Sequence, residues 1–244
     1  MMDKKAFFEL LTSVFEKYGI KCELTEQMFD TFYKMTYRLL EENEKYNLTA
    51  IRTAEGVAEN HIFDSILPSS LIFEGARVLD VGSGGGFPSL PLATVRPDIS
   101  ITALDSTEKK VEYIRSTAEL LGLSNVNTVC GRAEELSAAD SPLRESFDVV
   151  IARSVASLDV LSELCVPFLK VGGIFIAMKS EKAAHEAKEA ENALYLLGCV
   201  QKCELIKPYS IDPETDKMFF VTSKRSSTPI KYPRKYAQIK KKPL

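Results

Sequence analysis

The sequence lacks the features that would assign it to a membrane or a secreted class. No stretch approaches the roughly 18 uninterrupted apolar residues that a membrane-spanning helix needs. The N-terminus does not resemble a secretory signal, because Glu9 and Glu16 interrupt the region that would have to be continuously apolar. These absences lead us to expect a soluble, cytoplasmic protein with no membrane partner.

Cysteine and histidine are scarce and scattered. The five cysteines are an odd number and contain no C-x-x-C pair. The two histidines, His61 and His185, lie too far apart to suggest a zinc site with them. We therefore expect reduced structural thiols and no bound metal.

Charge is distributed unevenly along the 244 residues. Residues 224–244 contain 8 Lys or Arg and no acid, whereas residues 1–223 contain 23 bases and 34 acids. A basic end of this kind is typical of nucleic-acid binding, although it also occurs for solubility. The short Tyr232-Pro233-Arg234 element within it could instead pack on the body of the protein.

Residues 1–70 have the periodicity of amphipathic helices. Apolar residues recur at helical spacing from Phe7 to Tyr18 and again from Met28 to Leu39, with Thr25 as a candidate N-cap between them. We interpret both apolar stripes as packing surfaces. The expected organisation is a helical extension over residues 1–70, a main domain over 71–224 and a basic tail over 225–244.

From Ala76 onward, short Val- and Ile-rich runs alternate with helical stretches. The predicted strands are Arg77–Val81, Ile99–Leu104, Val126–Cys130, Phe147–Ala152 and Ile174–Met178. Helices separate the strands, for example the one that ends at Gly122, so the sheet should be mainly parallel and doubly wound in an α/β fold. After a helix near Ala183–Leu197, two further strands, Cys199–Ile206 and Met218–Ser223, are too close for a crossover and should form an antiparallel hairpin.

A glycine-rich loop follows the first predicted strand. Asp80 precedes it, and its glycines include Gly82, Gly84 and Gly86, with a helix expected to begin near Pro88. Glycines let the backbone approach a ligand closely, and the following helix offers its positive N-terminus. The dinucleotide fingerprint G-x-G-x-x-G needs a small residue where this chain has Phe87. The G-x-G-x-G spacing behind an acid instead resembles the first motif of S-adenosylmethionine-dependent methyltransferases.

Asp105 supports an adenosine ligand. It lies at the end of the second predicted strand, where a carboxylate can accept hydrogen bonds from both ribose hydroxyls. A nicotinamide cofactor would use it equally well. The terminal hairpin, in contrast, favours a methyltransferase sheet over a dehydrogenase.

Several further motifs carry a more specific resemblance. The chain contains, in order, Asn47-Leu48-Thr49-Ala50-Ile51, His61-Ile62-Phe63-Asp64-Ser65, the glycine loop through Phe87-Pro88, Leu104-Asp105-Ser106, Gly131-Arg132-Ala133-Glu134-Glu135, Ala152-Arg153-Ser154-Val155-Ala156 and Tyr232-Pro233-Arg234-Lys235. In this order and spacing they resemble the ribosomal RNA small-subunit methyltransferase G family, also called glucose-inhibited division protein B. The resemblance runs from the second predicted helix to the C-terminus.

This resemblance implies a Rossmann-like class I methyltransferase that methylates N7 of one guanosine, position 527, in 16S ribosomal RNA. The cofactor would be S-adenosyl-L-methionine, with S-adenosyl-L-homocysteine as product, and the partner would be 16S RNA or a small-subunit assembly particle. The expected cofactor-binding residues are Asp80, Gly82, Gly84, Phe87, Asp105, Ser106, Ala133, Glu134 and Arg153. The expected RNA-binding residues are Asn47, Thr49, Lys217, Arg234 and Lys235. We expect the protein to act as a monomer.

Some positions depart from the family pattern. Ser89 follows the proline where the family usually has glycine, and Ser154 stands where alanine is commoner. Lys217 stands near a position that is usually arginine before the last strand. His61 fits either a core residue or a site residue.

The residues around the fourth predicted strand fit methyl transfer to a nitrogen that already has a free lone pair. Guanine N7 needs no deprotonation, so a protein can work mainly by orienting the reactants. The strand is followed by Arg153 rather than by the Asp/Asn-Pro-Pro-Tyr/Phe quartet that grips an exocyclic amine, and Cys165-Val166-Pro167 is not a Pro-Cys nucleophile. Arg153 is the expected catalytic residue, at the strand end where doubly wound sheets bind ligands, and it could hold a phosphate, a cofactor carboxylate or guanine O6. The alternatives are a nicotinamide-dependent oxidoreductase, a small-molecule methyltransferase and a non-catalytic adenosine- or RNA-binding protein.

Overall fold

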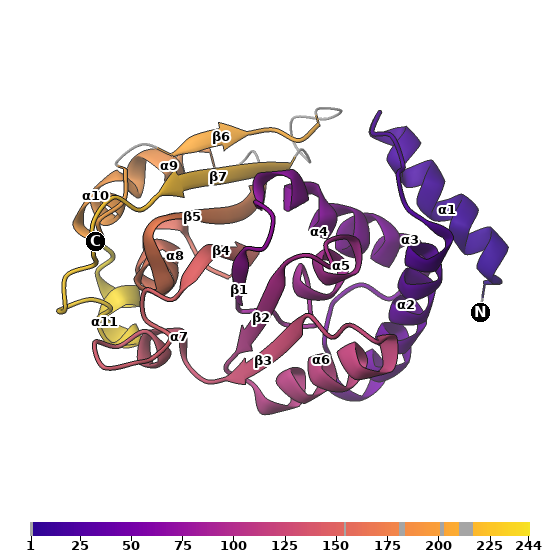
Figure 1. Cartoon of the computed structure of the whole chain (residues 1–244), viewed down its shortest axis with the longest axis horizontal. Helices are drawn as coiled ribbons and strands as arrows, with labels where there is room; N and C mark the ends of the chain where they lie inside the picture. Colours follow the sequence, from indigo (N-terminus) through magenta and orange to yellow (C-terminus); the bar gives the residue numbers. More distant parts are fainter. Residues whose placement is uncertain (1, 154, 181–183, 201–202, 210–216) are drawn as a thin grey trace.

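The computed structural model describes the whole chain except residues 1, 154, 181–183, 201–202 and 210–216. One sheet of seven strands forms its centre (Figure 1), in the order β3-β2-β1-β4-β5-β7-β6. The strands are β1 (Arg77–Val81), β2 (Ser100–Asp105), β3 (Val126–Cys130), β4 (Phe147–Arg153), β5 (Leu169–Ser180), β6 (Glu204–Ile206) and β7 (Lys217–Ser223). Strands β1 to β5 run parallel, and β7 pairs antiparallel with both β5 and β6. The doubly wound α/β fold with a C-terminal antiparallel hairpin is therefore confirmed.

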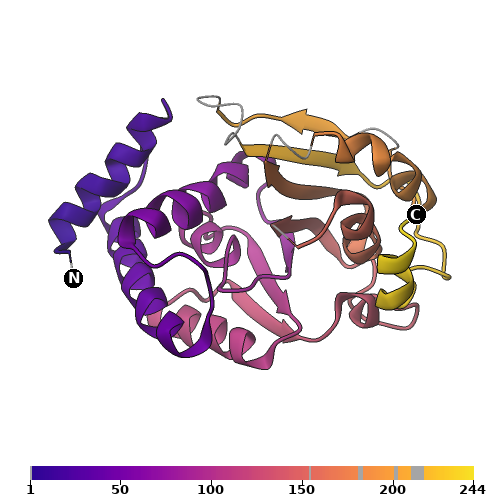
Figure 2. The same ribbon diagram turned by 180° about the vertical axis from the view of Figure 1, so that it is seen from behind.

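Helices cover both faces of the sheet. One layer contains α1 (Lys4–Lys17), α2 (Glu26–Tyr46), α3 (Ala54–Val57), η1 (Ala58–Phe63), α4 (Asp64–Ile66), η2 (Leu67–Leu71), α5 (Ser89–Val95) and α6 (Glu108–Leu121). The other contains α7 (Ala133–Leu136), α8 (Leu158–Cys165), η3 (Val166–Phe168), α9 (Glu186–Glu189), α10 (Glu191–Leu196) and α11 (Tyr236–Lys241). Figures 1 and 2 show α1 and α11 at opposite ends of the molecule. The central strands β1 and β4 are mostly buried because helices cover both of their faces, whereas the edge strands β3 and β6 contain no buried residue.

The N-terminal helices begin and pack as the periodicity predicts. The side chain of Thr25 caps α2 by accepting a hydrogen bond from the backbone N–H of Met28. The α2 residues Phe32, Met35 and Leu39 are fully buried in a core cluster that also contains residues of α6. Gly122 ends α6 in the left-handed conformation, as expected of a C-terminal glycine.

Two expectations about the C-terminal half need correction. The helix expected near Ala183–Leu197 is two short helices, α9 and α10, which meet at the buried Ala190; Ala183 itself lies outside the described residues. Strand β6 begins only at Glu204, and Cys199 forms an isolated bridge with Lys224 instead. A run of strand-forming residues does not reveal how far a partner strand extends, so the sequence overestimates β6.

The basic C-terminal segment, residues 225–244, packs on the body. The guanidinium of Arg144 donates hydrogen bonds to the backbone oxygens of Thr228 and Tyr232. The side chain of Lys224, just before this segment, is fully buried and pairs with Glu145. The tail is therefore held by specific contacts, as the alternative interpretation of the Tyr232-Pro233-Arg234 element predicts.

Candidate functional site

The glycine loop connects β1 to α5 at the carboxyl edge of the parallel strands. The N–H groups of Gly82 and Ser83 donate to the backbone oxygen of Leu104, at 2.8 and 3.0 Å, and this fixes the loop against β2. Gly82 has a φ of +76°, and a Cβ there would stand 2.8 Å from a methyl of Val155. The hydroxyl of Ser83 is buried and has no hydrogen-bond partner among the described residues. A buried polar group in this state needs a ligand or water to satisfy it.

Asp80, at the end of β1, connects this loop to the start of α5. Its carboxylate accepts hydrogen bonds from the backbone N–H and the hydroxyl of Ser89, the first residue of α5. Burial raises the pKa of Asp80 to about 6. The side chain is completely buried and is not part of the wall of either cavity described below. Its position gives it the role of holding the loop on α5. Its other carboxylate oxygen has no hydrogen-bond partner among the described residues, so a cofactor contact by Asp80 stays a prediction.

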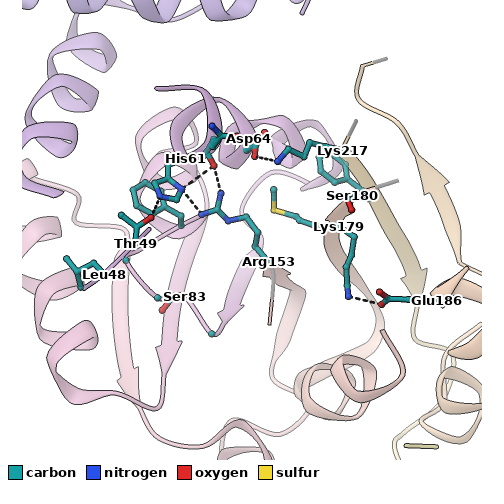
Figure 3. A pocket seen from close by; sticks show the side chains of 17 residues that line it. Leu48, Thr49, His61, Asp64, Ser83, Arg153, Lys179, Ser180, Glu186 and Lys217 are labelled. Atoms are coloured by element: carbon teal, nitrogen blue, oxygen red, sulfur yellow. Dashed lines mark hydrogen bonds and ion pairs between the residues drawn. The ribbon is translucent and has the colours of Figure 1, made fainter. Parts of the chain in front are cut away.

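A cavity of about 660 Å³ opens beside the loop. It lies between the glycine loop, the Leu48–Thr49 segment, η1 and α4, and the ends of β4, β5 and β7 (Figure 3). Expected site residues in its wall are Thr49, Gly82, Gly84, Phe87, Arg153 and Lys217. Ligand sites of doubly wound sheets lie at this edge, so the position agrees with the fold.

Arg153 lies at the centre of a hydrogen-bonded chain in this cavity. Its guanidinium donates to the backbone oxygen of Asn60 at 2.7 Å and to Nδ1 of His61 at 3.0 Å. On the other side of the imidazole, Nε2 of His61 lies 2.7 Å from the hydroxyl of Thr49 (Figure 3). The guanidinium also lies 5.6 Å from the ring centroid of Phe87, on which His61 stacks at 4.3 Å.

Burial and these contacts keep His61 in its neutral form. A guanidinium can only donate, so its contact with Nδ1 uses the lone pair of that nitrogen and leaves the proton on Nε2, which then donates to Thr49. The backbone oxygen of Asn60, 3.1 Å from Nδ1, can only accept and favours the other tautomer. Burial, joined by the positive charge of Arg153, lowers the pKa of His61 to about 3. His61 is therefore a neutral imidazole whose two nitrogens are both occupied. It belongs to the site and not only to the core.

The two carboxylates in the cavity wall both have cationic partners. Asp64 is paired with Lys217 at 2.8 Å, and Glu186 is paired with Lys179 at 2.7 Å. Arg153, in contrast, forms no ion pair with any carboxylate of the described residues. Burial lowers its pKa, yet an arginine stays charged at neutral pH. The cavity thus contains a positive charge that is available to an anionic ligand.

A second cavity, of about 290 Å³, adjoins the first. Its wall includes the expected cofactor residues Asp105, Ser106, Ala133 and Glu134. Gly82 and Arg153 line both cavities, so they mark the place where the two meet. Asp105 lies at the end of β2 and accepts hydrogen bonds from the N–H groups of Gly84 and Thr107, at 3.0 and 2.9 Å. It therefore joins the glycine loop to the start of α6 as well as facing the cavity.

Three of the expected RNA-binding residues lie outside both cavities. Asn47 is exposed at the left-handed end of α2, where its side-chain oxygen accepts a hydrogen bond from Arg52. The guanidinium of Arg234 forms a two-pronged ion pair with the buried Glu163, and an RNA contact by Arg234 stays a prediction. Lys235 is exposed just before α11.

The structure adds residues that the sequence pattern did not single out. Asp64, Lys179, Glu186 and Tyr236 line the cavities together with the expected residues. Asp64 lies within one of the motifs quoted above, and its burial beside Lys217 could not be read from that motif. Lys179 and Glu186 come from β5 and α9, and no spacing in the sequence links them to the glycine loop.

Comparison with known proteins shows the family to which the chain belongs. Residues 26–206 match the model of a family described as rRNA small subunit methyltransferase G. The chain belongs to this family. A methyltransferase G from Streptococcus pyogenes is 43% identical over 224 residues, which is 90% of this chain and 91% of the relative. Another from Streptococcus gordonii is 40% identical over 249 residues and covers both chains completely.

Solved structures agree about the fold of this methyltransferase G family member. A SAM-dependent O-methyltransferase from Thermotoga maritima has a TM-score of 0.50 at 20% identity, covering 78% of this chain and 72% of that one. At this identity the likeness concerns the fold only. These comparisons give no support to the oxidoreductase or to the non-catalytic alternative, and the chain is an rRNA methyltransferase by family.

The cavities fit the adenosylmethionine cofactor of this methyltransferase class. The carboxylate of Asp105 suits the ribose hydroxyls of the cofactor, and the cation of Arg153 suits its carboxylate. The unsatisfied hydroxyl of Ser83 can form a hydrogen bond with a further polar atom of the cofactor. In the part of the chain that the structure describes, no three His, Cys, Asp or Glu residues are grouped to hold a metal ion. Among the described residues there is also no helix with the length and hydropathy to cross a membrane.

Proposed function

We propose that this protein transfers the methyl group of S-adenosylmethionine to N7 of guanosine 527 in 16S ribosomal RNA. The observation that carries the proposal is the pair of adjoining cavities that share Gly82 and Arg153 in a chain of the methyltransferase G family. The smaller cavity would hold the adenosine, with Asp105 facing the ribose and Glu134 facing the adenine. The larger cavity would receive the target base, with the methyl donor at their junction.

The chemistry of the larger cavity supports a nitrogen that already has a free lone pair as the target. Removal of a proton would require a base, and both carboxylates of the wall are already paired with lysines. The nitrogens of His61 are occupied by Arg153 and Thr49, and its pKa of about 3 makes it a poor base. Bound adenosylmethionine supplies an activated methyl group. The chain's own residues would then orient the base and exclude water.

Arg153 would act on whichever acceptor reaches the junction. Its guanidinium can hold guanine O6, a phosphate or the carboxylate of the cofactor, and His61 and Asn60 keep its plane in one orientation. Lys217 and Thr49 line the same cavity and would contact the RNA. The exposed Lys235 would contact the phosphate backbone outside it. Asn47 would lie at the rim of the RNA contact.

The experiment that tests the proposal is methylation with a labelled donor, followed by mapping of the modified nucleoside. Naked 16S RNA and small-subunit assembly particles should be compared side by side, because either can present the base. Label at N7 of guanosine 527 is the expected result. Label on another nucleoside, or no transfer with either substrate, would contradict it. The monomeric state and the cytoplasmic location stay predictions.

A further inference from the structure

The C-terminal segment contributes a residue to the smaller cavity. Tyr236, the first residue of α11, lines this cavity together with residues from the ends of β1, β2 and β4. Leu164 of α8 lines the same wall. The cavity wall is therefore formed not only by residues at the ends of the strands but also by Tyr236, which lies far away from them in the sequence.

Arg234 fixes the position of α11 relative to α8. Its backbone N–H and its Nε donate to Oε1 of Glu163, at 2.8 and 2.9 Å, and one terminal nitrogen donates to Oε2 at 2.6 Å. The other terminal nitrogen donates to the backbone oxygen of Lys242 at 3.0 Å, just after α11. One side chain thus ties both ends of a short helix to a single buried carboxylate, which is a strong, directional arrangement.

The remaining contacts of α11 leave Tyr236 able to meet a ligand. Ile239 is completely buried in the core cluster that includes α8, and this anchors the helix. Tyr236 is 38% exposed, one helical turn before Ile239. An aromatic side chain in this position offers a large contact surface to a planar base at small cost in conformational entropy.

We propose that the C-terminal segment completes the adenosine-binding wall, with Tyr236 as a ligand-contacting residue and Arg234 as the residue that positions it. This inference rests on the cofactor of the proposed function. It gives the Tyr232-Pro233-Arg234 element a role at the cofactor rather than a direct role at the RNA. It also places the exposed lysines of α11 on the same element as one wall of the cofactor cavity.

The first test measures the affinity of the full-length protein for S-adenosylhomocysteine by calorimetry. Tyr236→Ala is expected to weaken binding about tenfold, since it removes one aromatic wall of the cavity. Tyr236→Phe keeps the ring and should bind like the wild type. Tyr195→Ala is the matched control, because Tyr195 is 66% exposed and lines neither cavity.

The second test separates positioning from a general structural role. Arg234→Ala should weaken S-adenosylhomocysteine binding by a similar factor. If Arg234 acts through Tyr236, the Arg234→Ala/Tyr236→Ala variant should lose no more affinity than the weaker-binding single variant. If the affinity of the double variant falls by the product of the two single-variant factors, the positioning role is overturned. Should Arg234→Ala fail to fold because Glu163 is left unpaired, Glu163→Gln/Arg234→Gln removes the buried charge and is measured in its place.

Failure of this inference can be distinguished from failure of the proposed function. Asp105→Ala serves as the reference variant, because Asp105 faces the same cavity from β2. Wild-type affinity in Tyr236→Ala, together with weakened binding in Asp105→Ala, would overturn this inference and leave the proposed function intact. A wild-type protein that binds neither adenosylmethionine nor S-adenosylhomocysteine would overturn both.

Discussion

Arg153 brings a positive charge into a cavity whose two carboxylates already have partners. The geometry around it is a fork: two of its nitrogens donate to two different acceptors, the Asn60 oxygen and the imidazole of His61. The imidazole is in turn held by Thr49 and by stacking on Phe87. An orientation specified by so many contacts serves a group that has to meet its ligand in one position.

We expect Arg153→Ala to lower methyl transfer at least tenfold, since one charge-assisted hydrogen bond contributes about 1.5–3 kcal/mol. Arg153→Lys should rescue poorly, because an ammonium keeps the charge but cannot reach both acceptors as a planar fork. Turnover and thermal melts of both variants provide the measurement. The melting temperatures should fall much less than turnover, because Arg153 lies at a strand end and its hydrogen bonds go to Asn60 and His61 in the cavity wall. Wild-type turnover in Arg153→Lys would mean that only charge is needed, and a fully active Arg153→Ala would remove Arg153 from the site.

His61 should make the stability of the protein depend on pH. In the folded state its pKa is lowered to about 3, whereas an unfolded histidine has a pKa near 6.5. Between these values the unfolded chain binds a proton that the native protein does not, so stability falls as the pH drops below about 6.5, by at most about 1.4 kcal/mol per pH unit. His61→Gln should remove this contribution. Urea denaturation at pH 7, 6 and 5 measures it.

Asp80 acts in the opposite direction and has to be separated from His61. Burial raises its pKa to about 6, so the native state binds this proton before the unfolded chain does, and that contribution grows as the pH falls from 6 toward 4. The prediction therefore concerns the difference in the free energy of unfolding between wild type and His61→Gln at each pH. The contribution of Asp80 is the same in both proteins and cancels in this difference. His185→Gln is the control for the second histidine. A difference that does not change with pH would contradict the low pKa of His61.

At the scale of elements, the sequence predicts the sheet well because its signals are local. The bounds of β1 and β3 agree with the predicted strands, and the Thr25 and Gly122 caps lie at the expected helix ends. The glycine loop and Asp105 are likewise recognisable from their position after strands. Asp64, Lys179 and Glu186 are brought to the cavity by tertiary packing, and no periodicity or spacing encodes such a meeting.

The ion pair between Asp64 and Lys217 connects α4 to the first residue of β7 in the wall of the larger cavity. Asp64 is buried, so Lys217→Met should leave an unpaired carboxylate and lower the free energy of unfolding by about 1–3 kcal/mol. Lys217→Arg keeps the pair and should be close to wild type. Urea denaturation of both variants is the measurement. The Asp64→Asn/Lys217→Met variant should recover part of the loss, and a Lys217→Met protein of unchanged stability would show that the pair contributes nothing.

At the scale of the whole molecule, the structure divides the basic residues of the C-terminal end, 224–244, into two groups. Lys224 and Arg234 neutralise Glu145 and Glu163 and are part of the fold. The other basic residues between 224 and 244 are exposed, namely Arg225, Lys231, Lys235, Lys240, Lys241 and Lys242. Composition alone could not make this division, because both groups look identical in a count of charges. Only the exposed group is free to meet phosphates.

The exposed lysines around α11 should contribute electrostatic affinity for RNA. Replacing Lys235, Lys240, Lys241 and Lys242 by Gln is expected to flatten the log–log dependence of RNA affinity on salt by about 3, at about 0.7 per phosphate contact on single strands. The fold should be unaffected, because the Arg234 contacts are kept. Lys5→Gln/Lys21→Gln is the control, since both lysines are exposed in the N-terminal region around α1, at the opposite end of the molecule from α11. Binding titrations at several salt concentrations measure the slopes. An unchanged slope in the fourfold variant would mean that the RNA approaches the cavity from another side, over the residues around Lys179 and Lys217.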